Sequence, residues 1–242
     1  MDALRGVEDA LREYGLMKLK FRALYRLVFE NPFMRRLLPA LPGVPEILVF
    51  GKIAFSVTDG LPGLGRLDTV ILDAPATGHG TALLTAPSVV VATVQAGPLA
   101  EDARRLRALL LDRAGTRFHI VTTPEEMPVA ESEELYETLA VQQGFPFGPV
   151  FANQVQARGL RPDQRDLLGL AARSHRTDAA CAVVSGALFM ADRTDVQRAH
   201  LQRLRNRVPL PLIELPDVQG GRTPRERIEV LADHLDARLW RE

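Results

Sequence analysis

The chain has little cysteine and no cluster of metal-binding side chains. Cys181 is the single cysteine among 242 residues, so an internal disulfide is excluded. The five histidines are scattered along the sequence, and with one cysteine they form no group with the spacing of a zinc site. Small apolar residues surround Cys181, which predicts a buried thiol rather than a reactive one.

The chain also has no excess of charge and no long hydrophobic run. Thirty basic residues balance thirty acidic ones, so nothing in the overall charge favours nucleic acid or anionic lipid. No apolar run reaches the roughly 18 residues that a membrane-spanning helix needs, and the first residues are too charged for a signal peptide. We therefore expect a cytoplasmic protein that is not integral to a membrane and has no nucleic-acid partner.

The first part of the sequence predicts helices. Apolar residues recur at helical spacing over residues 2–30, 33–38 and 45–56, and basic side chains lie between them. This Leu-, Phe- and Met-rich segment is expected either to cover a sheet or to form a groove for an apolar partner helix. We interpret residues 1–60 as a helical part and residues 61–242 as the α/β part of a single domain covering 1–242.

From Asp68 onward, short β-branched runs alternate with helical periods. This alternation is typical of a parallel sheet covered by helices, so the predicted fold is a three-layer α/β arrangement. Thr223, followed by Pro224 and Glu226, is typical of a helix start. Strands are expected at 69–73, 117–122, 148–154 and 211–215, with 89–94 either a further strand or part of a helix or switch segment. Helices are expected at 100–112, 129–142, 162–173, 177–206 and 224–240.

The most informative stretch is Asp68-Thr-Val-Ile-Leu-Asp73-Ala-Pro-Ala-Thr77-Gly-His79-Gly80. It predicts a buried strand that ends on the carboxylate of Asp73 and passes into a Gly-rich loop carrying Thr77 and His79. A nucleotide hydrolase places an aspartate near magnesium in this way and follows it with a switch loop. Two simpler interpretations stay open: Asp73 as a strand-end turn residue and His79 as a helix-start or packing residue.

The usual partner of such a stretch, the phosphate-binding motif Gly-x-x-x-x-Gly-Lys-Ser/Thr, is absent from these 242 residues. Gly51-Lys52 is the only Gly-Lys pair, and Ile53 follows it where Ser or Thr is required. Glu46 stands at the position of the first glycine, so this segment cannot wrap a phosphate in backbone amides. The sequence therefore carries half of a phosphate site.

Other polar residues follow the predicted strands. Ligands of open parallel sheets bind outside the carboxyl ends of the strands. We therefore expect Asp73, Pro124-Glu125, Asn153 and Pro216-Asp217 to lie at one edge. Any α/β protein offers polar strand ends, and Asn153 is also a good turn-former.

The run from Asp73 to Gly80 resembles switch II of the ArsA and Get-type ATPases. This family includes the arsenite-pump motor and the factor that delivers tail-anchored membrane proteins. The sequence is most similar to the bacterial branch, whose loop reads Asp-Ala-Pro-Ala-Thr-Gly-His-Gly and whose later strand leads into Pro-Glu-Glu-Met-Pro. The resemblance spans about residues 16–242 and also includes Leu38–Gly43 with Glu46, Asp68–Asp73, Leu83-Leu84 with Ala86-Pro87, Pro124-Glu125 and Asn153-Gln154.

The resemblance implies a P-loop NTPase-like hydrolase fold that lacks its first βα unit, with ATP and Mg²⁺ as cofactors. Asp73 would hold the magnesium ion through a water molecule. Thr77, Gly78 and His79 would form the switch that responds to the γ-phosphate.

The resemblance also implies a base-binding side. Asn153 would hydrogen-bond the adenine edge, and Pro216 and Asp217 would line the base and the ribose. The family places nucleotide at a dimer interface, so it implies a homodimer or a heterodimer with an intact ATPase. The cysteine pair that joins some family dimers through zinc is missing here, as are the cysteines that bind arsenite.

The family's P-loop and its switch I aspartate are also missing, and three interpretations follow. In the first interpretation, the chain is the C-terminal portion of an ATPase that couples hydrolysis to transport or membrane-protein targeting. Alternatively, it is a noncatalytic pseudo-ATPase that pairs with an intact subunit. The third interpretation is an ATP-independent binder of hydrophobic client segments, based on the helices between residues 16 and 55. Under the first two, the chain should not hydrolyse ATP alone, because phosphoryl transfer depends on positioning and charge.

A parallel sheet without its first βα unit leaves one side open to water. We therefore predict that the isolated chain is poorly stable or associates with another chain. Size-exclusion chromatography and denaturant unfolding check this expectation. A monomer that unfolds cooperatively would contradict it.

Overall fold

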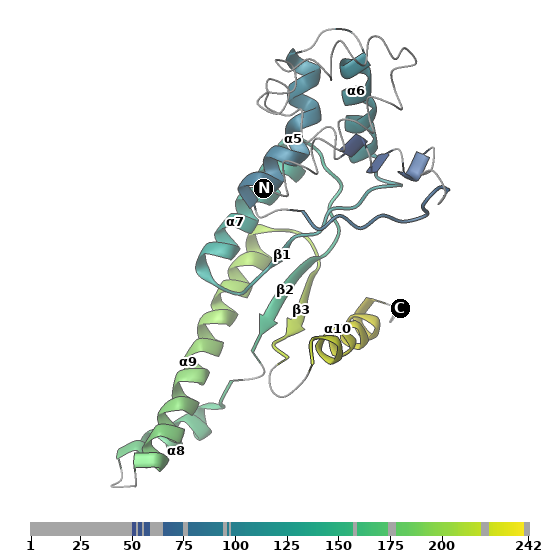
Figure 1. Cartoon of the computed structure of the whole chain (residues 1–242). Helices are drawn as coiled ribbons and strands as arrows, with labels where there is room; N and C mark the ends of the chain where they lie inside the picture. The colour runs from purple at the N-terminus through teal and green to yellow at the C-terminus, as the bar shows by residue number, and fades with distance from the viewer. Residues whose placement is uncertain are drawn as a thin grey trace, which may run out of the picture. The chain divides into compact units, whose positions relative to one another are not determined.

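The computed structural model describes residues 50–51, 53–54, 56–58, 65–74, 77–93, 96, 98–156, 159–173, 178–218 and 223–239. The chain divides into two compact units, residues 1–116 and 117–242, and each is described by itself (Figure 1). The predicted helices 2–30 and 33–38 lie outside the described residues, and so does most of helix 45–56. The predicted single domain with its boundary at residue 60 stays a prediction.

In the first unit, two helices pack against each other. Helix α5 covers Thr77–Thr93 and helix α6 covers Pro98–Leu111. Both helices carry buried apolar side chains, among them Leu84, Val90 and Leu106. Helix α6 confirms the predicted helix 100–112. Seven described residues between 50 and 58 are also helical, in agreement with the end of the predicted helix 45–56.

One predicted strand of the first unit is wrong, and a second run takes the helical alternative that the sequence had left open. Residues 69–73 have no regular secondary structure, and Ile71 is 91% exposed. A strand of a parallel sheet is buried by neighbours on both sides, and no described residue pairs with this run. Residues 89–93 belong to helix α5. Packing of Val90 in the core of the unit outweighs the β propensity of this valine-rich run.

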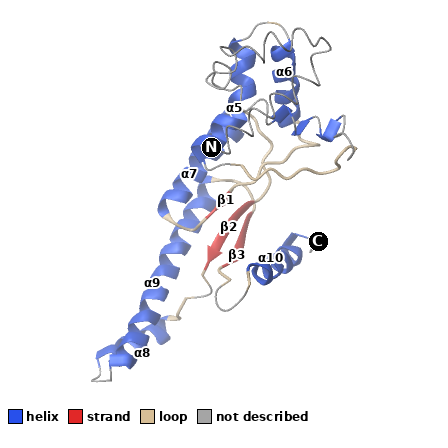
Figure 2. Cartoon of the chain, in the orientation of Figure 1, coloured by secondary structure: helices blue, strands red, loops and turns tan. Residues whose placement is uncertain are grey.

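The second unit contains a parallel three-stranded sheet with the order β1-β2-β3 (Figure 2). Strand β1 covers Val121–Thr122, β2 covers Val150–Val155 and β3 covers Leu212–Pro216. An isolated parallel bridge between Phe118 and Phe147 precedes β1. The sheet confirms the predicted α/β class with parallel strands, although β1 is shorter than the predicted 117–122.

Helices flank this sheet. Helices α7 and α9 lie on one side and α10 on the other (Figure 1). Their extents agree with the predicted helices to within a few residues, except that α7 starts three residues early and ends in a π-helical turn, η3. The bounds are α7 Glu126–Tyr136, η3 Glu137–Gln142, α8 Pro162–Arg173, α9 Asp178–Arg207 and α10 Pro224–Leu239.

The predicted start of α10 is confirmed by a capping box. The Thr223 backbone N–H donates to Glu226 Oε2 at 2.7 Å, and the Glu226 N–H donates to Thr223 Oγ1 at 3.3 Å. These two bonds satisfy backbone donors that a helix start otherwise leaves unpaired. Within the described part of the chain, no helix is long and apolar enough to cross a bilayer.

The core of the second unit lies between the sheet and helices α7 and α9. An ion pair at its surface joins the two helices, with Arg203 Nε and Glu133 Oε1 2.8 Å apart. The hydrogen bond to Glu133 raises the pKa of the Arg203 guanidinium above its ordinary value. The buried cluster consists of Ile120, Val129, Val150, Leu204 and Val208.

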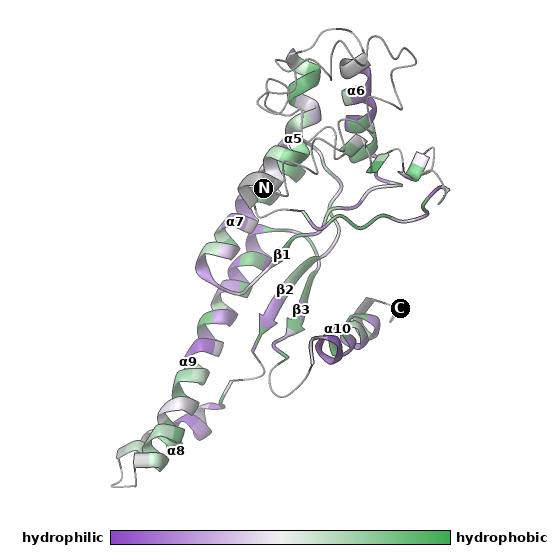
Figure 3. Cartoon of the chain, viewed as in Figure 1, coloured by the Kyte–Doolittle hydropathy of each residue, from purple (hydrophilic) through white to green (hydrophobic). Residues whose placement is uncertain are grey.

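Helix α9 has two different halves. Its first half is apolar and packs against α8, whereas its second half is polar and rich in arginine (Figure 3). Cys181 lies in the first half and is partly exposed, so the prediction of a buried thiol is wrong. The reason is that α8 leaves parts of the apolar face uncovered, as the exposed Val183 and Phe189 show.

Replacing Leu204 by alanine tests the core. Leu204 is 1% exposed, and the Leu204→Ala variant should lose about 2–5 kcal/mol of unfolding free energy because it leaves a cavity between α9 and the sheet. The matched control is Leu167→Ala on α8, where the side chain is 65% exposed, and a change within about 0.5 kcal/mol is expected. Urea unfolding measures both, and equal losses would contradict this core assignment.

Candidate functional site

Several residues that were predicted to share an edge come together at the carboxyl ends of the three strands. Because the strands are parallel, these ends point the same way. Strand β1 leads into Pro124-Glu125, β2 contains Asn153, and β3 ends at Pro216 before Asp217. The roles assigned to these residues stay predictions.

Asp217 joins the ends of β2 and β3. Its carboxylate oxygen Oδ2 accepts a hydrogen bond of 2.6 Å from Gln156 Nε2. Its backbone N–H donates to the carbonyl of Val155 at 2.9 Å. The carboxylate is therefore held at the strand ends by both backbone and side chain.

Gln197 on α9 binds the backbone at the carboxyl end of strand β2. Its side chain is buried, with the residue 4% exposed. Oε1 accepts from the Gln156 N–H at 2.9 Å, and Nε2 donates to the Gln154 carbonyl at 3.3 Å. Sequence reasoning missed this residue. The available signal was a glutamine four positions before Leu201 and seven before Leu204, on the helical face that packs against the sheet.

The backbone changes direction after Asn153. Gln154 has a φ of 58°, in the left-handed region, and the pairing of β2 with β3 shifts register between Ala152 and Val155. The Gln154 N–H donates to Asn153 Oδ1 at 2.9 Å, which is the behaviour of a turn-former. Asn153 Nδ2 has no hydrogen-bond partner among the described residues, so it is available to a ligand.

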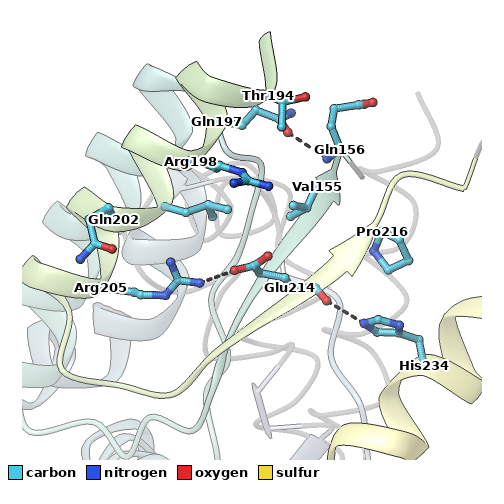
Figure 4. Close-up of a pocket in the computed structure, with 11 residues that line it drawn as sticks. Val155, Gln156, Thr194, Gln197, Arg198, Gln202, Arg205, Glu214, Pro216 and His234 are labelled. Atoms are coloured by element: carbon cyan, nitrogen blue, oxygen red, sulfur yellow. Dashed lines mark hydrogen bonds and ion pairs between the residues drawn. The ribbon is translucent and has the colours of Figure 1, made fainter. Parts of the chain in front are cut away.

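A pocket of about 540 Å³ lies next to these strand ends, between α9 and the edge strand β3 (Figure 4). Arg205 forms an ion pair with Glu214 in its wall. The Nε2 atom of His234 on α10 lies 2.9 Å from the Glu214 carbonyl oxygen, which can only accept, so Nε2 is the donor. The lining residues are Val155, Gln156, Thr194, Gln197, Arg198, Leu201, Gln202, Arg205, Glu214, Pro216 and His234.

The phosphate-side residues predicted from the sequence belong to the first unit. Asp73 is exposed, and its carboxylate has no partner within the part of the chain that the structure describes. Residues 77–79 form the first turn of α5 rather than the predicted Gly-rich loop. The helix that packs on α6 therefore begins at Thr77. Nothing is described of the Thr77, Gly78 and His79 side chains.

Magnesium fits the chemistry of Asp73. Among the described residues, no three His, Cys, Asp or Glu side chains gather into a metal site. Magnesium does not need such a cage, because it commonly binds through one or two carboxylates, water and substrate phosphates. An exposed, unpaired carboxylate can serve in that way.

No protein-family model matches the chain. Over 166 residues it is 30% identical to the ATPase BagA of Mycobacterium tuberculosis (strain ATCC 25618 / H37Rv), and the match covers 64% of this chain and 46% of that protein. The same values hold for two proteins provisionally named ATPases, from Mycobacterium bovis and from Mycobacterium tuberculosis strain CDC 1551. The chain is thus similar to proteins named ATPases, and the match spans about half the length of these curated relatives.

The Gln197 network predicts a cost for its removal. Gln197→Leu keeps the side chain's approximate size but leaves the Gln156 N–H and the Gln154 carbonyl unpaired, so the unfolding free energy should fall by about 1–3 kcal/mol. Gln202→Leu, an exposed position five residues later, is the control and should change it by less than about 0.5 kcal/mol. Thermal unfolding measures the stability of both variants. An unchanged unfolding free energy in Gln197→Leu would contradict the stabilising role of the Gln197 hydrogen bonds.

Proposed function

We propose that this chain is part of an ArsA/Get-type ATPase, in which ATP binding and hydrolysis drive transport or membrane-protein targeting. The observation that carries the proposal is the 166-residue similarity to proteins named ATPases. The switch II-like run from Asp73 to Gly80 supports the finer family assignment. The parallel sheet of the second unit supports a P-loop NTPase-like fold.

The base of the nucleotide binds at the ends of β2 and β3. Asn153 Nδ2 donates to a ring nitrogen of adenine, while Asn153 Oδ1 stays bonded to the Gln154 N–H. Pro216 offers an apolar surface to the base. Asp217, positioned by Gln156, accepts a hydrogen bond from a ribose hydroxyl. A carboxylate has lone pairs for both bonds.

The resemblance assigns the phosphate-side roles to residues 73 and 77–79. Asp73 would hold magnesium through a water molecule, and the start of α5 at Thr77-Gly78-His79 would respond to the γ-phosphate. Magnesium supplies charge that neutralises the transferred phosphoryl group. The phosphate-loop lysine and the carboxylate that orients the attacking water must come from residues other than these 242.

The proposal predicts nucleotide binding without turnover. A fluorescent ATP analogue should bind the full chain, and Asn153→Ala should weaken binding roughly fivefold through loss of a hydrogen bond to the base. Asn206→Ala, the same change at an exposed site on α9, is the control and should bind like the wild type.

Two results would contradict the proposal. If the chain binds no nucleotide, the proposed base site at the ends of β2 and β3 is wrong. Magnesium-dependent turnover by the chain alone, abolished in Asp73→Ala, would show that these residues build a phosphate cradle of another kind.

A second candidate is a noncatalytic subunit that pairs with an intact ATPase. The missing Gly-Lys-Ser/Thr sequence favours it. Mixing the chain with an ATPase such as BagA distinguishes the two: a partner subunit co-elutes with the ATPase and changes its hydrolysis rate. The hydrophobic-client interpretation rests on the helices between residues 16 and 55, of which the structure describes only residues 50–51 and 53–54.

A further inference from the structure

We propose that the pocket between α9 and β3 binds a small oxyanion, that is, a small molecule carrying a phosphate or carboxylate group. Arg198 is the residue that recognises it. This site adjoins the proposed base site, because Pro216 lines both, but neither Asn153 nor Asp217 lines the pocket and nothing in the ATPase proposal uses Arg198.

The pocket lies where the side of α9 next to its apolar stripe carries polar residues, buried ones and exposed ones. A helix that packs on a sheet normally presents an apolar stripe to it. Leu201 and Leu204 provide that stripe at the core, but polar side chains at spacings of three and four residues continue along the neighbouring face. These are Thr194, Gln197, Arg198, Gln202 and Arg205. Such side chains do not fill the space above the strands as leucines would.

The charges in the pocket wall do not cancel. Arg205 is paired with Glu214 of β3. Arg198 points toward the strand residues Val155 and Glu214, and it has no ion pair or hydrogen bond with any described residue (Figure 4). One positive charge of the pocket wall, on the exposed residue Arg198, therefore has no counter-charge among the described residues.

The chemistry of the wall selects the ligand. A guanidinium presents a planar fork of donors that matches the paired oxygens of a carboxylate or phosphate. Val155 and Pro216 add apolar surface next to it. A volume of about 540 Å³ is within the range of small-molecule sites. The ligand class is thus an oxyanion with a small apolar body.

The test is isothermal titration calorimetry of the full chain with inorganic pyrophosphate and, separately, malonate, without magnesium and with sodium chloride fixing the ionic strength. Both probes should bind the wild type. Arg198→Gln should lower the affinity roughly tenfold, because a charge-assisted contact is lost. Arg207→Gln, the same change at the exposed end of the same helix, is the control and should bind normally.

A second variant should act in the opposite direction. Glu214→Gln keeps the shape of the side chain but removes the carboxylate that neutralises Arg205, so both oxyanions should bind more tightly. Circular dichroism verifies that each variant is folded. Equal losses in Arg198→Gln and Arg207→Gln, no tightening in Glu214→Gln, or no binding of either probe by the wild type would overturn the proposal.

A competition arm identifies the source of the oxyanion. ATP should leave pyrophosphate binding unchanged, and Asn153→Ala should bind pyrophosphate like the wild type. If ATP displaces pyrophosphate and Arg198→Gln weakens ATP binding as much as Asn153→Ala does, the pocket holds the phosphates of the nucleotide. That result would overturn the separate site while leaving the proposed function intact.

Discussion

Strand β2 is the constraint on which the second unit depends, because among the described strands it alone is hydrogen-bonded on both sides. Its pairing with β1 and β3 sets all three strands parallel and so brings their carboxyl ends to one edge. Val150, the first residue of β2, lies in the same buried cluster as Leu204. The polar residues after it are consequently held by a rigid element, which is what a binding site requires.

Helix α9 serves the sheet in two ways. Leu204 and Val208 close the core at one end of the strands, where burial of apolar surface is the stabilising term. Further toward the carboxyl edge, Gln197 replaces apolar contact by hydrogen bonds to the backbone of β2. That exchange allows β2 to turn at Gln154, since the carbonyl and N–H groups freed from the ladder find a partner.

The two proposed sites lie side by side on this framework. The base site uses the strand ends, and the oxyanion pocket uses the face of the sheet under α9, with Pro216 at their border. Their chemistry differs because hydrogen-bond donors and acceptors of Asn153 and Asp217 suit a base and a ribose, whereas the unpaired Arg198 suits a negative charge.

The sequence by itself determined the elements from residue 98 onward, because hydrophobic periodicity and the capping signals at Thr223 are local properties. It also determined the resemblance around Asp73 and the placing of Asn153 and Pro216 at strand ends. Only the tertiary structure decided that 89–93 is helical and that 69–73 forms no strand, since burial by neighbours overrides local propensity. Only the tertiary structure decided, likewise, that Gln197 is buried, that Arg198 has no partner among the described residues and that Arg205 is paired with Glu214. Residue type does not distinguish two arginines on one helix; the carboxylate of Glu214 on a distant strand does.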